Sequence, residues 1–263
     1  MRCFPYFCFF IIFFSIEALG QVVYPNGATF DKTYLELPEV TGNDTLIIHS
    51  GYICRYNSYT LIPDWVAYEL TSFEVHGQYK RSGSFGMDPS FSGRQAMRED
   101  YSNSGWDKGH MAPAADMKWS QESMYESFFL TNVCPQNHSL NEKIWLTIEQ
   151  IARRVADENG SVWIICGPIV NENKYGTIGQ QNVVVPDQFF KAMLTYLPET
   201  DTFSAISFVL NNNDEIQSLT DAAMSIDEIE KILNLNLFCN LERKIQRKVE
   251  AKYDLNCWKI YKQ

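Results

Sequence analysis

The sequence SGWDKGHMAPAAD, residues 104–116, places His110 between a Lys-Gly pair and a Met-Ala-Pro turn. The whole chain of 263 residues contains only four histidines. A histidine in a polar, turn-rich stretch with charges on both sides has two explanations. It is either a general base in catalysis, or a loop residue that bonds to a backbone carbonyl. The remainder of the chain has to distinguish them.

A second polar segment, TNVCPQNHSLNEKIWLTIE, occupies residues 131–149. It offers several side-chain oxygens to a cation: Asn132, Gln136, Asn137, Asn141, Glu142 and Glu149. One imidazole combined with hard oxygen ligands suits Mg²⁺, which keeps several waters and takes few protein ligands. The pattern therefore predicts a magnesium site, in which Mn²⁺ could substitute.

The segment from Leu140 to Gly160 predicts the strongest helix of the chain, because its isoleucines and valine recur at helical spacing. In such a helix Asn141 and Glu149 lie ~12 Å apart along the axis and ~80° apart around it. The two side chains cannot both bind one ion directly without a long reach. We therefore expect Asn141 to be the direct ligand and Glu149 to hold metal-bound waters.

The order of the other patterns predicts an α+β fold with a largely antiparallel sheet. Strands are expected at 52–56, 65–70 and 161–170, followed by an antiparallel pair at 189–197 and 202–210. A short helix is expected at 121–130, and a capping box predicts another helix after Ser225. The tail from Leu237 to Lys252 is expected to be helical. No linker divides the chain, so residues 21–263 are predicted to form a single domain.

The first 20 residues have the pattern of a secretory signal peptide. An apolar run follows Arg2, and Ala18-Leu19-Gly20 resembles a cleavage site. The prediction is a secreted protein, or one in the secretory-pathway lumen, that begins at Gln21 and has no stable membrane association; the alternative is an uncleaved anchor. Five cysteines would remain. Cys166 is expected to be a buried thiol, while Cys239 and Cys257 are close enough in sequence to form a disulfide bond.

The formal net charge of −10 argues against a broad surface for nucleic acid. Basic residues nevertheless gather around the segments already described: Lys80, Arg81, Arg94, Arg98, Lys108, Lys118 and Lys143. Distant acidic residues are largely screened beyond ~10 Å at moderate salt, so a local patch with a bound cation can outweigh the net charge. Arg153 and Arg154 are expected to lie on a solvent-exposed helix face.

Taken in order, these segments resemble the DNA/RNA non-specific endonucleases of the ββα-metal superfamily, which includes endonuclease G-like and secreted bacterial nucleases. The stretch DKGHMAPAAD resembles the family signature D-R-G-H-x-A-P. FFLTNVCPQNHSLNEKIWLTIE resembles the segment with N-x-x-P-Q, then Asn, then Glu eight residues on. RYNSYTLIPDWVAYEL, VWIICGPI and SIDEIEKILNLNLF resemble strands and a late helix of the family. The resemblance covers nearly all of the chain after residue 20.

The resemblance implies a ββα-metal nuclease fold and assigns roles to matching positions. His110 would be the general base, Asn141 the protein ligand of Mg²⁺, and Glu149 would hold metal-bound waters. Asn132 would support the histidine or the metal region. Arg81 is the candidate for contacting phosphate, with Lys80 or Arg94 as alternatives because the spacing to Asp88-Pro89 departs from the family. Lys108 stands where the family usually has arginine, and Asp107 is expected to tie the loop down.

The implied activity is Mg²⁺-dependent hydrolysis of phosphodiester bonds in DNA and RNA, with little sequence specificity and with 5′-phosphate products. Two alternatives stay open. One is a catalytically inactive nucleic-acid-binding protein of the same fold, and the other is a metal phosphodiesterase acting on small nucleotides. The sequence does not determine the oligomeric state, and a homodimer is one assembly considered.

Overall fold

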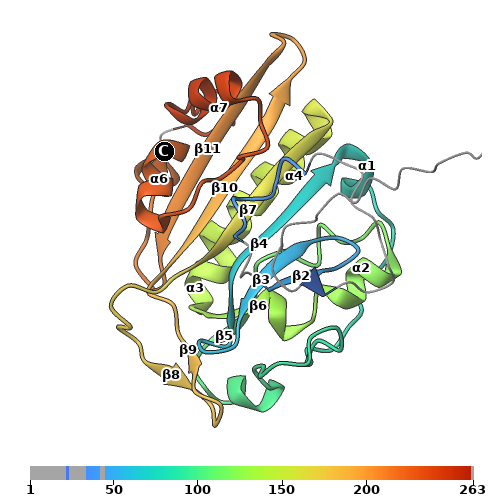
Figure 1. Ribbon diagram of the computed structural model, residues 1–263, viewed down its shortest axis with the longest axis vertical. Coiled ribbons are helices and arrows are strands. Elements are labelled where there is room, and N and C mark those ends of the chain that lie inside the picture. Colours follow the sequence, from blue (N-terminus) through green and yellow to red (C-terminus); the bar gives the residue numbers. More distant parts are fainter. Residues whose placement is uncertain (1–21, 24–33, 42–44, 262–263) are drawn as a thin grey trace, which may run out of the picture.

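The computed structural model describes residues 22–23, 34–41 and 45–261. The expected signal peptide at 1–20 lies outside these residues. The central element is an eight-stranded sheet in the order β1-β2-β3-β4-β7-β10-β11-β12 (Figure 1). Its first two strands are parallel and all other neighbours are antiparallel. The bounds are β1 (Val22–Val23), β2 (Leu46–Ile48), β3 (Ile53–Asn57), β4 (Ile62–Thr71), β7 (Ser161–Ile169), β10 (Gln188–Leu197), β11 (Thr202–Asn211) and β12 (Ala223–Met224).

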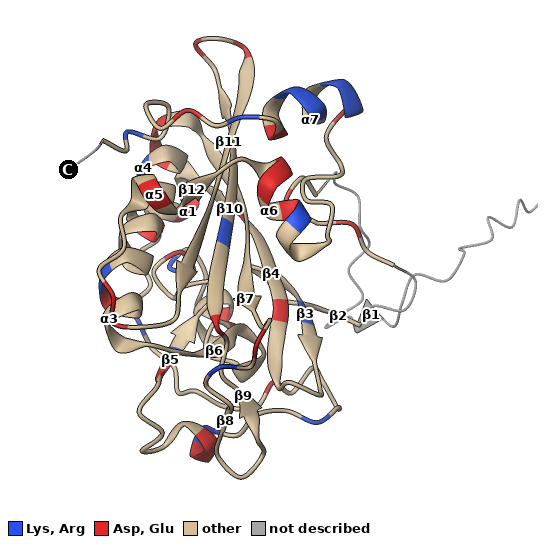
Figure 2. Ribbon diagram, turned by 90° about the vertical axis from the view of Figure 1, so that its left-hand side faces the viewer, with Lys and Arg blue, Asp and Glu red and all other residues tan. Residues whose placement is uncertain are grey.

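Helices cover both faces of this sheet, as Figure 2 shows. On β10 the side chains alternate, since successive residues of a strand point to opposite faces. Phe189 and Met193 pack in the core with α4 (Leu146–Asn159), whereas Phe190, Ala192 and Leu194 pack in the core with α6 (Ile226–Leu233) and α7 (Arg243–Glu250). The expected α+β fold with a largely antiparallel sheet is confirmed.

A separate two-stranded ribbon and the long helix form the unit that carries the candidate site. In this ribbon β5 (Asp107–His110) pairs antiparallel with β6 (Val133–Gln136). Gly109 is required there, because a Cβ atom at this position would lie 2.1 Å from Gln136 Oε1. The chain then enters α3 (His138–Leu140), the π-helical turn η3 (Asn141–Trp145) and α4.

The ends of this composite helix follow local chemistry. Asn137 caps its start, as its side-chain oxygen accepts hydrogen bonds from the backbone nitrogens of Ser139 at 2.9 Å and Leu140 at 3.2 Å. Gly160 ends it at a φ of 98°, a conformation that glycine adopts without strain. The helix expected between Leu140 and Gly160 is confirmed, but the π-helical turn at its start has no signature in the apolar spacing.

Short elements connect these parts, and among them α2 falls within the helix expected at 121–130. Their bounds are α1 (Ser72–Val75), η1 (Arg98–Tyr101), α2 (Gln121–Glu126), η2 (Leu130–Asn132), β8 (Thr177–Ile178), β9 (Val183–Val184) and α5 (Leu219–Ala222). The expectation of a helix from Leu237 to Lys252 is wrong in its first part, because only α7 is helical. Leu237 and Phe238 are both buried, and Phe238 has a φ of 46°, so the chain turns here.

The five cysteines of the described residues are free thiols, so the disulfide bond considered for Cys239 and Cys257 is not formed. The Cys239 thiol faces the Leu37 carbonyl at 3.6 Å, whereas the Cys257 thiol faces Asp254 Oδ2 at 3.6 Å. Cys166 is buried, as expected, and its thiol donates to the Met111 carbonyl at 3.2 Å. In the described part of the chain, we find no helix with both the length and the apolar character required to span a bilayer.

Candidate active site

His110 ends β5 and lies between two aromatic rings. Its ring centroid is 5.0 Å from that of Phe85 and 5.2 Å from that of Phe128, in a T-shaped contact with the latter. The residue is half-buried, but its Nε2 atom is buried and has no hydrogen-bond partner among the described residues. Buried polar atoms are nearly always hydrogen-bonded, and a catalytic role or a bound water or ion is among the explanations of an exception. Nε2 is therefore available to something that the protein itself does not supply.

The electrostatic surroundings keep this imidazole neutral. Burial, and then the positive charge of Arg81, lower the pKa of His110 to about 3. Removing a cation from water is unfavourable, and a second cation nearby adds to that cost. A neutral imidazole with a free ring nitrogen is the form that accepts a proton from a reacting group.

Arg81 is exposed and lies over the ring of Phe128, one of the two rings that contact His110. Its guanidinium carbon lies 5.5 Å from the centroid of the Phe128 ring, in the range of a cation–π contact. Its charge lowers the pKa of His110, and it acts against the rise that burial causes in the pKa of Glu149. The structure thus brings these three sequence-predicted residues into one electrostatic neighbourhood.

Asn132 is buried, and its side chain forms hydrogen bonds with the backbone of the loop that follows His110. Its Oδ1 atom accepts a hydrogen bond from the Ala112 nitrogen at 2.9 Å. Its Nδ2 atom donates to the carbonyls of Ala112 and Ser127, both at 2.8 Å. The Asn132 carbonyl also accepts from the Met111 nitrogen at 3.0 Å. The side chain therefore fixes the backbone two residues after the histidine, and the Asn132 carbonyl fixes the backbone one residue after it.

Asp107 joins the start of β5 to the start of the composite helix. Its Oδ2 atom accepts a hydrogen bond from Asn141 Nδ2 at 3.0 Å and lies 2.9 Å from His138 Nδ1. The expectation that Asp107 has a structural role is in line with these contacts. Because the amide nitrogen of Asn141 is engaged, its Oδ1 atom is left to bind a ligand; no hydrogen bond joins this atom to another described residue.

Glu149 is buried on α4, with 7% of its surface exposed. Burial raises its pKa to about 7, while Lys191 and Arg153 act to lower it and Asp116 to raise it. The Arg153 guanidinium lies 2.6 Å from Asp116 Oδ1 and 3.9 Å from Glu149 Oε2. The expectation that Arg153 faces solvent is therefore wrong, since the side chain joins two buried carboxylates.

Lys108 is another basic residue that lies close to His110. Lys108 Nζ lies 5.7 Å from the Phe85 ring and 5.5 Å from the Tyr101 ring, so Lys108 and His110 share one side of β5. Burial and then the charge of Arg98 lower the pKa of Lys108.

Lys80 and Arg94 are placed differently. Arg94 donates to the backbone carbonyls of Ser58 and Gln181, which commits its guanidinium to holding two loops. Lys80 is exposed, and no contact joins its side chain to another described residue.

Sequence reasoning missed two features of the site. The aromatic wall of Phe85 and Phe128 comes from loops with no periodic pattern, so only the structure reveals it. Lys191 is fully buried on β10, and its Nζ has no hydrogen-bond partner in the part of the chain that the structure describes; this atom lies 4.3 Å from the centroid of the Trp145 ring. A lysine inside the apolar run FFKAMLTYL is the signal that could have identified it.

The residues at this site fit a magnesium ion by the chemistry of their donors. Asn141 presents an amide oxygen whose orientation is fixed by Asp107, and Glu149 adds a buried carboxylate on the same composite helix. Mg²⁺ prefers oxygen ligands and keeps several of its waters, so one direct protein ligand with a carboxylate beyond the waters is a suitable set.

The ribbon, the composite helix and this donor set define a ββα-metal nuclease fold, and the similarity of the chain to known proteins supports this assignment. Residues 32–244 match the DNA/RNA non-specific endonuclease family. The chain belongs to that family. A solved structure described as the EndoG/EndoGI complex matches with a TM-score of 0.69 and 26% identity, over 76% of this chain and 88% of that chain.

Curated relatives are similar over most of this chain. Nuclease EXOG, mitochondrial, from Mus musculus is 34% identical over 74% of this chain and 57% of its own length. Nuclease EXOG, mitochondrial, from Danio rerio is 30% identical over 74% of this chain and 61% of its own length. Nuclease 1, mitochondrial, from Schizosaccharomyces pombe is 31% identical over 74% of this chain and 66% of its own length. The chain thus spans about three fifths of the length of the first two relatives.

The names of these relatives contradict the cellular compartment that was expected from the sequence. All three relatives are named as mitochondrial, so the expectation of a secreted protein or one in the secretory-pathway lumen is wrong. An apolar amino-terminal run after a single basic residue does not by itself specify one compartment, because several targeting routes use apolar or amphipathic leaders.

Proposed function

We propose that this chain is a Mg²⁺-dependent endonuclease that hydrolyses phosphodiester bonds of DNA and RNA with little sequence specificity. The observation that carries the proposal is the buried, neutral and unpartnered Nε2 atom of His110 beside Arg81. The family and the names of the relatives support the nuclease activity, and the residues of the site support the assignment of roles.

In the proposed reaction His110 Nε2 accepts a proton from a water molecule, and the water oxygen attacks phosphorus. The bond from phosphorus to the 3′ oxygen breaks, and that oxygen leaves with a proton from solvent. The products are a 5′ phosphate and a 3′ hydroxyl. A general base contributes ~10²–10⁴-fold to such a step. Asn132 acts as a positioning residue, because it holds the backbone that follows the histidine.

We assign the magnesium ion to Asn141 Oδ1, with Glu149 accepting hydrogen bonds from metal-bound waters. When bound, a divalent ion neutralises negative charge on the phosphate and on the leaving oxygen. Asp107 orients Asn141, so its contribution to metal binding is indirect. Lys191 and Arg153 favour the ionised form of Glu149, which is the form that accepts hydrogen bonds.

The proposed substrates are DNA and RNA because the contacts needed are to phosphate. Arg81, Arg98 and Lys108 supply positive charge around His110 in a chain whose net charge is −10. A water nucleophile makes the ribose 2′ hydroxyl unnecessary, so both sugars can be accepted. For the compartment we propose the mitochondrion, in agreement with the names of the relatives. A homodimer stays a prediction, which light scattering after size-exclusion chromatography tests.

One assay tests the proposal against both alternatives. Supercoiled plasmid and a long RNA are incubated with the protein in Mg²⁺, in excess EDTA, and in EDTA followed by excess Mn²⁺. We expect nicking and RNA digestion in Mg²⁺, none in EDTA, and recovery in Mn²⁺. Binding without cleavage would identify an inactive binder. Faster hydrolysis of a small aryl phosphodiester than of plasmid would identify a small-nucleotide phosphodiesterase.

A further inference from the structure

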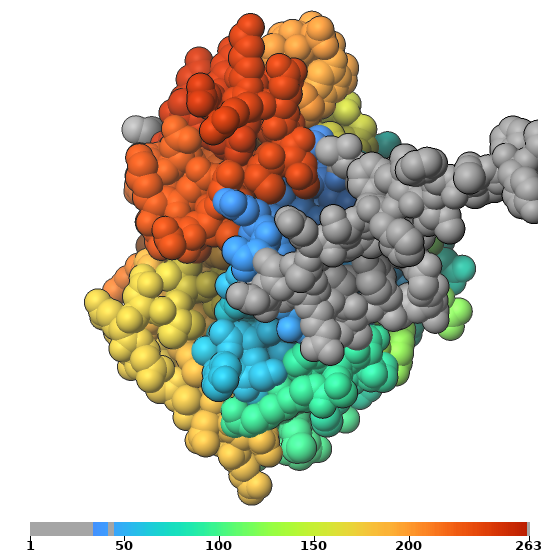
Figure 3. Space-filling view, in the orientation of Figure 1, coloured from blue at the N-terminus to red at the C-terminus, as the bar shows by residue number. Residues whose placement is uncertain are grey.

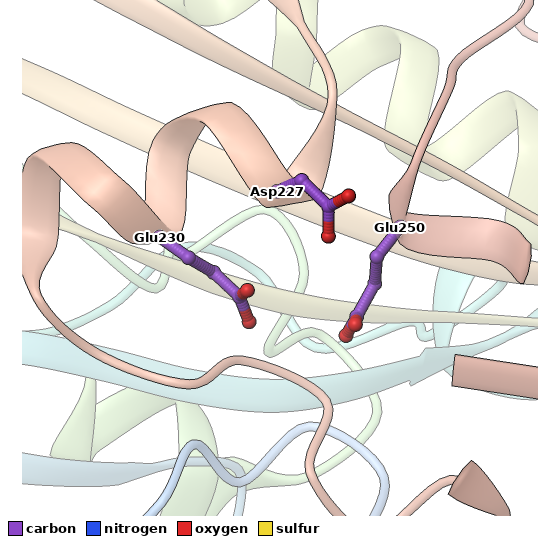
Figure 4. Close-up of side chains that lie close together, drawn as sticks. All are labelled: Asp227, Glu230 and Glu250. Atoms are coloured by element: carbon purple, nitrogen blue, oxygen red, sulfur yellow. The ribbon is translucent and has the colours of Figure 1, made fainter. Parts of the chain in front are cut away.

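Three carboxylates converge between the two carboxyl-terminal helices, away from the candidate active site. Asp227 and Glu230 lie on α6 and Glu250 ends α7. Figure 4 shows their carboxylates directed towards a common space. One oxygen of each lies within 4.8 Å of the others, and no other His, Cys, Asp or Glu side chains of the described chain gather in this way.

Glu250 provides an independent sign that something binds here. It is 95% buried, with 5% of its surface exposed, and its Oε1 atom has no hydrogen-bond partner among the described residues. Leaving a buried carboxylate oxygen without a partner is unfavourable unless a proton or a cation satisfies it. The Oε1 atom therefore lacks a partner among the described residues, and Figure 4 shows the Glu250 carboxylate directed into the group.

The three side chains carry charge of one sign, while Lys231 and Lys252 line the adjoining hollow together with Asp227. Burial, and then the neighbouring carboxylates of Glu230 and Asp227, raise the pKa of Glu250 to about 7. Burial and the Asp227 carboxylate also raise the pKa of Glu230, against a hydrogen bond from the Leu237 nitrogen at 2.6 Å. Within the described chain no lysine or arginine forms an ion pair with any of the three. The three carboxylates thus lie together with lysines nearby but without a direct ion pair to a described residue.

We propose that Asp227, Glu230 and Glu250 bind a divalent cation of the calcium class, which joins α6 to α7. Ca²⁺ takes six to eight oxygen ligands at 2.3–2.6 Å, so two ligands on opposite sides of the ion lie up to ~5 Å apart. The spacing of the three oxygens falls within that limit. Water completes the coordination, since Asp227 and Glu230 are only half-buried.

The site has a structural role that is separate from catalysis. Ile226, Ile229 and Val249 pack on the face of the sheet opposite to α4, and the carboxyl-terminal segment forms much of the surface in Figure 3. Glu250 is the last residue of α7, so its ligation fixes the end of a helix whose exposed face is strongly basic. The cation thereby replaces repulsion among the three carboxylates with coordination to one shared ion.

The experiment uses the full chain carrying Asn141→Ala, which removes the ligand proposed for the catalytic ion. Ca²⁺ is titrated by calorimetry, and the Tm is compared in EGTA and in Ca²⁺ at about a hundred times the measured Kd. We expect one Ca²⁺ per chain and a rise in Tm of about 5 °C or more. The matched control Glu199→Gln, which neutralises an exposed carboxylate in the β10–β11 turn, should respond in the same way.

The decisive variant adds Glu250→Gln to the same background. It should bind no Ca²⁺ and show no Ca²⁺-dependent rise in Tm, and its Tm in EGTA should equal or exceed that of the parent. If this variant does not fold, Asp227→Asn at a half-buried position replaces it, with a weakening of Ca²⁺ binding of at least tenfold expected. Calcium binding by the Glu250→Gln variant equal to the parent's overturns the proposal. So does a parent that binds no Ca²⁺, in which case the carboxyls share protons instead.

Discussion

Asn141 Nδ2 donates a hydrogen bond to Asp107 Oδ2 over 3.0 Å, and this bond joins the strand that carries His110 to the helix that carries the proposed metal ligand. The two residues are 34 positions apart in the sequence, so the bond exists only when β5, β6 and the composite helix are assembled. The spacing between the proposed base and the proposed metal ligand therefore depends on one carboxylate that performs neither role.

Replacing Asp107 with alanine should impair metal binding more than folding. Partners that orient a metal ligand typically contribute 10–100-fold to metal affinity or activity. We expect Asp107→Ala to raise the Mg²⁺ concentration for half-maximal plasmid cleavage by about tenfold or more. The control is His138→Ala, which removes the other partner of Asp107 and leaves the bond to Asn141. An unchanged Mg²⁺ dependence in Asp107→Ala would show that Asn141 needs no such orientation.

Lys108 should act through its charge. Its Nζ lies over the rings of Phe85 and Tyr101, where an arginine side chain can also stack. We expect Lys108→Arg to keep kcat/KM within about tenfold, roughly one 1.4 kcal/mol step. Lys108→Met should lose more and show a weaker dependence on ionic strength, measured on a defined duplex. A methionine variant equal to wild type at every salt concentration would make Lys108 a loop residue without a role in binding.

Lys191 should set the lower pH limit of activity. This buried cation lowers the pKa of Glu149, so removing it raises that pKa and favours the protonated carboxyl at neutral pH. We expect the acidic limb of the kcat/KM profile to move to higher pH in Lys191→Met, with activity at high pH less affected. Lys248→Met, on the exposed face of α7, is the matched control. If the two variants give superimposable pH profiles, Lys191 serves packing alone.

The buried ion pairs of His49 should make folding stability depend on pH. His49 Nε2 lies 2.8 Å from Asp88 Oδ2, and its Nδ1 lies 3.5 Å from Glu126 Oε1. Burial alone would lower the pKa of His49, but the hydrogen bonds and charges of the two carboxylates raise it to about 9. Because the pKa in the folded state lies above the ordinary 6.5, the pair contributes fully below that value, and its contribution is lost as the pH rises through 9.

Urea unfolding of wild type and of His49→Gln at pH 6, 7.5 and 9.5 measures this contribution. Breaking a buried pair by removing one partner costs about 3–5 kcal/mol. We expect the difference in the free energy of unfolding to be greatest at pH 6 and to diminish towards pH 9.5. A difference that is the same at all three pH values would mean that His49 is neutral in the folded protein.

Several structural features that depend on neighbouring residues in the sequence were predicted correctly. The apolar spacing from Ile144 to Val155 predicts the long helix, and Gly160 marks its end, because both are local properties. The capping box of Ser225 and Glu228 likewise forms as expected. The motif around His110 and its resemblance to a known family identified the fold, since the order of the segments is itself specific.

What could not be predicted depends on contacts between distant segments. The wall of Phe85 and Phe128 forms when a loop packs against the segment that precedes η2. From the sequence, Arg153 is expected on a solvent-exposed helix face. In the structure its guanidinium lies 2.6 Å from Asp116 Oδ1, a residue 37 positions earlier in the chain. The disulfide bond considered for Cys239 and Cys257 does not form for the same reason, because closeness in sequence does not determine where two side chains point.

The most direct test of the account is single-turnover cleavage of plasmid DNA by His110→Ala, together with DNA binding measured in EDTA. His76→Ala, an exposed histidine paired with Asp157, is the matched control and should cleave like wild type. Since the imidazole is proposed to accept the proton of the attacking water, we predict a cleavage rate about 10²–10⁴-fold lower with DNA affinity within about threefold of wild type. A His110→Ala protein that cleaves at a rate near that of wild type would contradict the account.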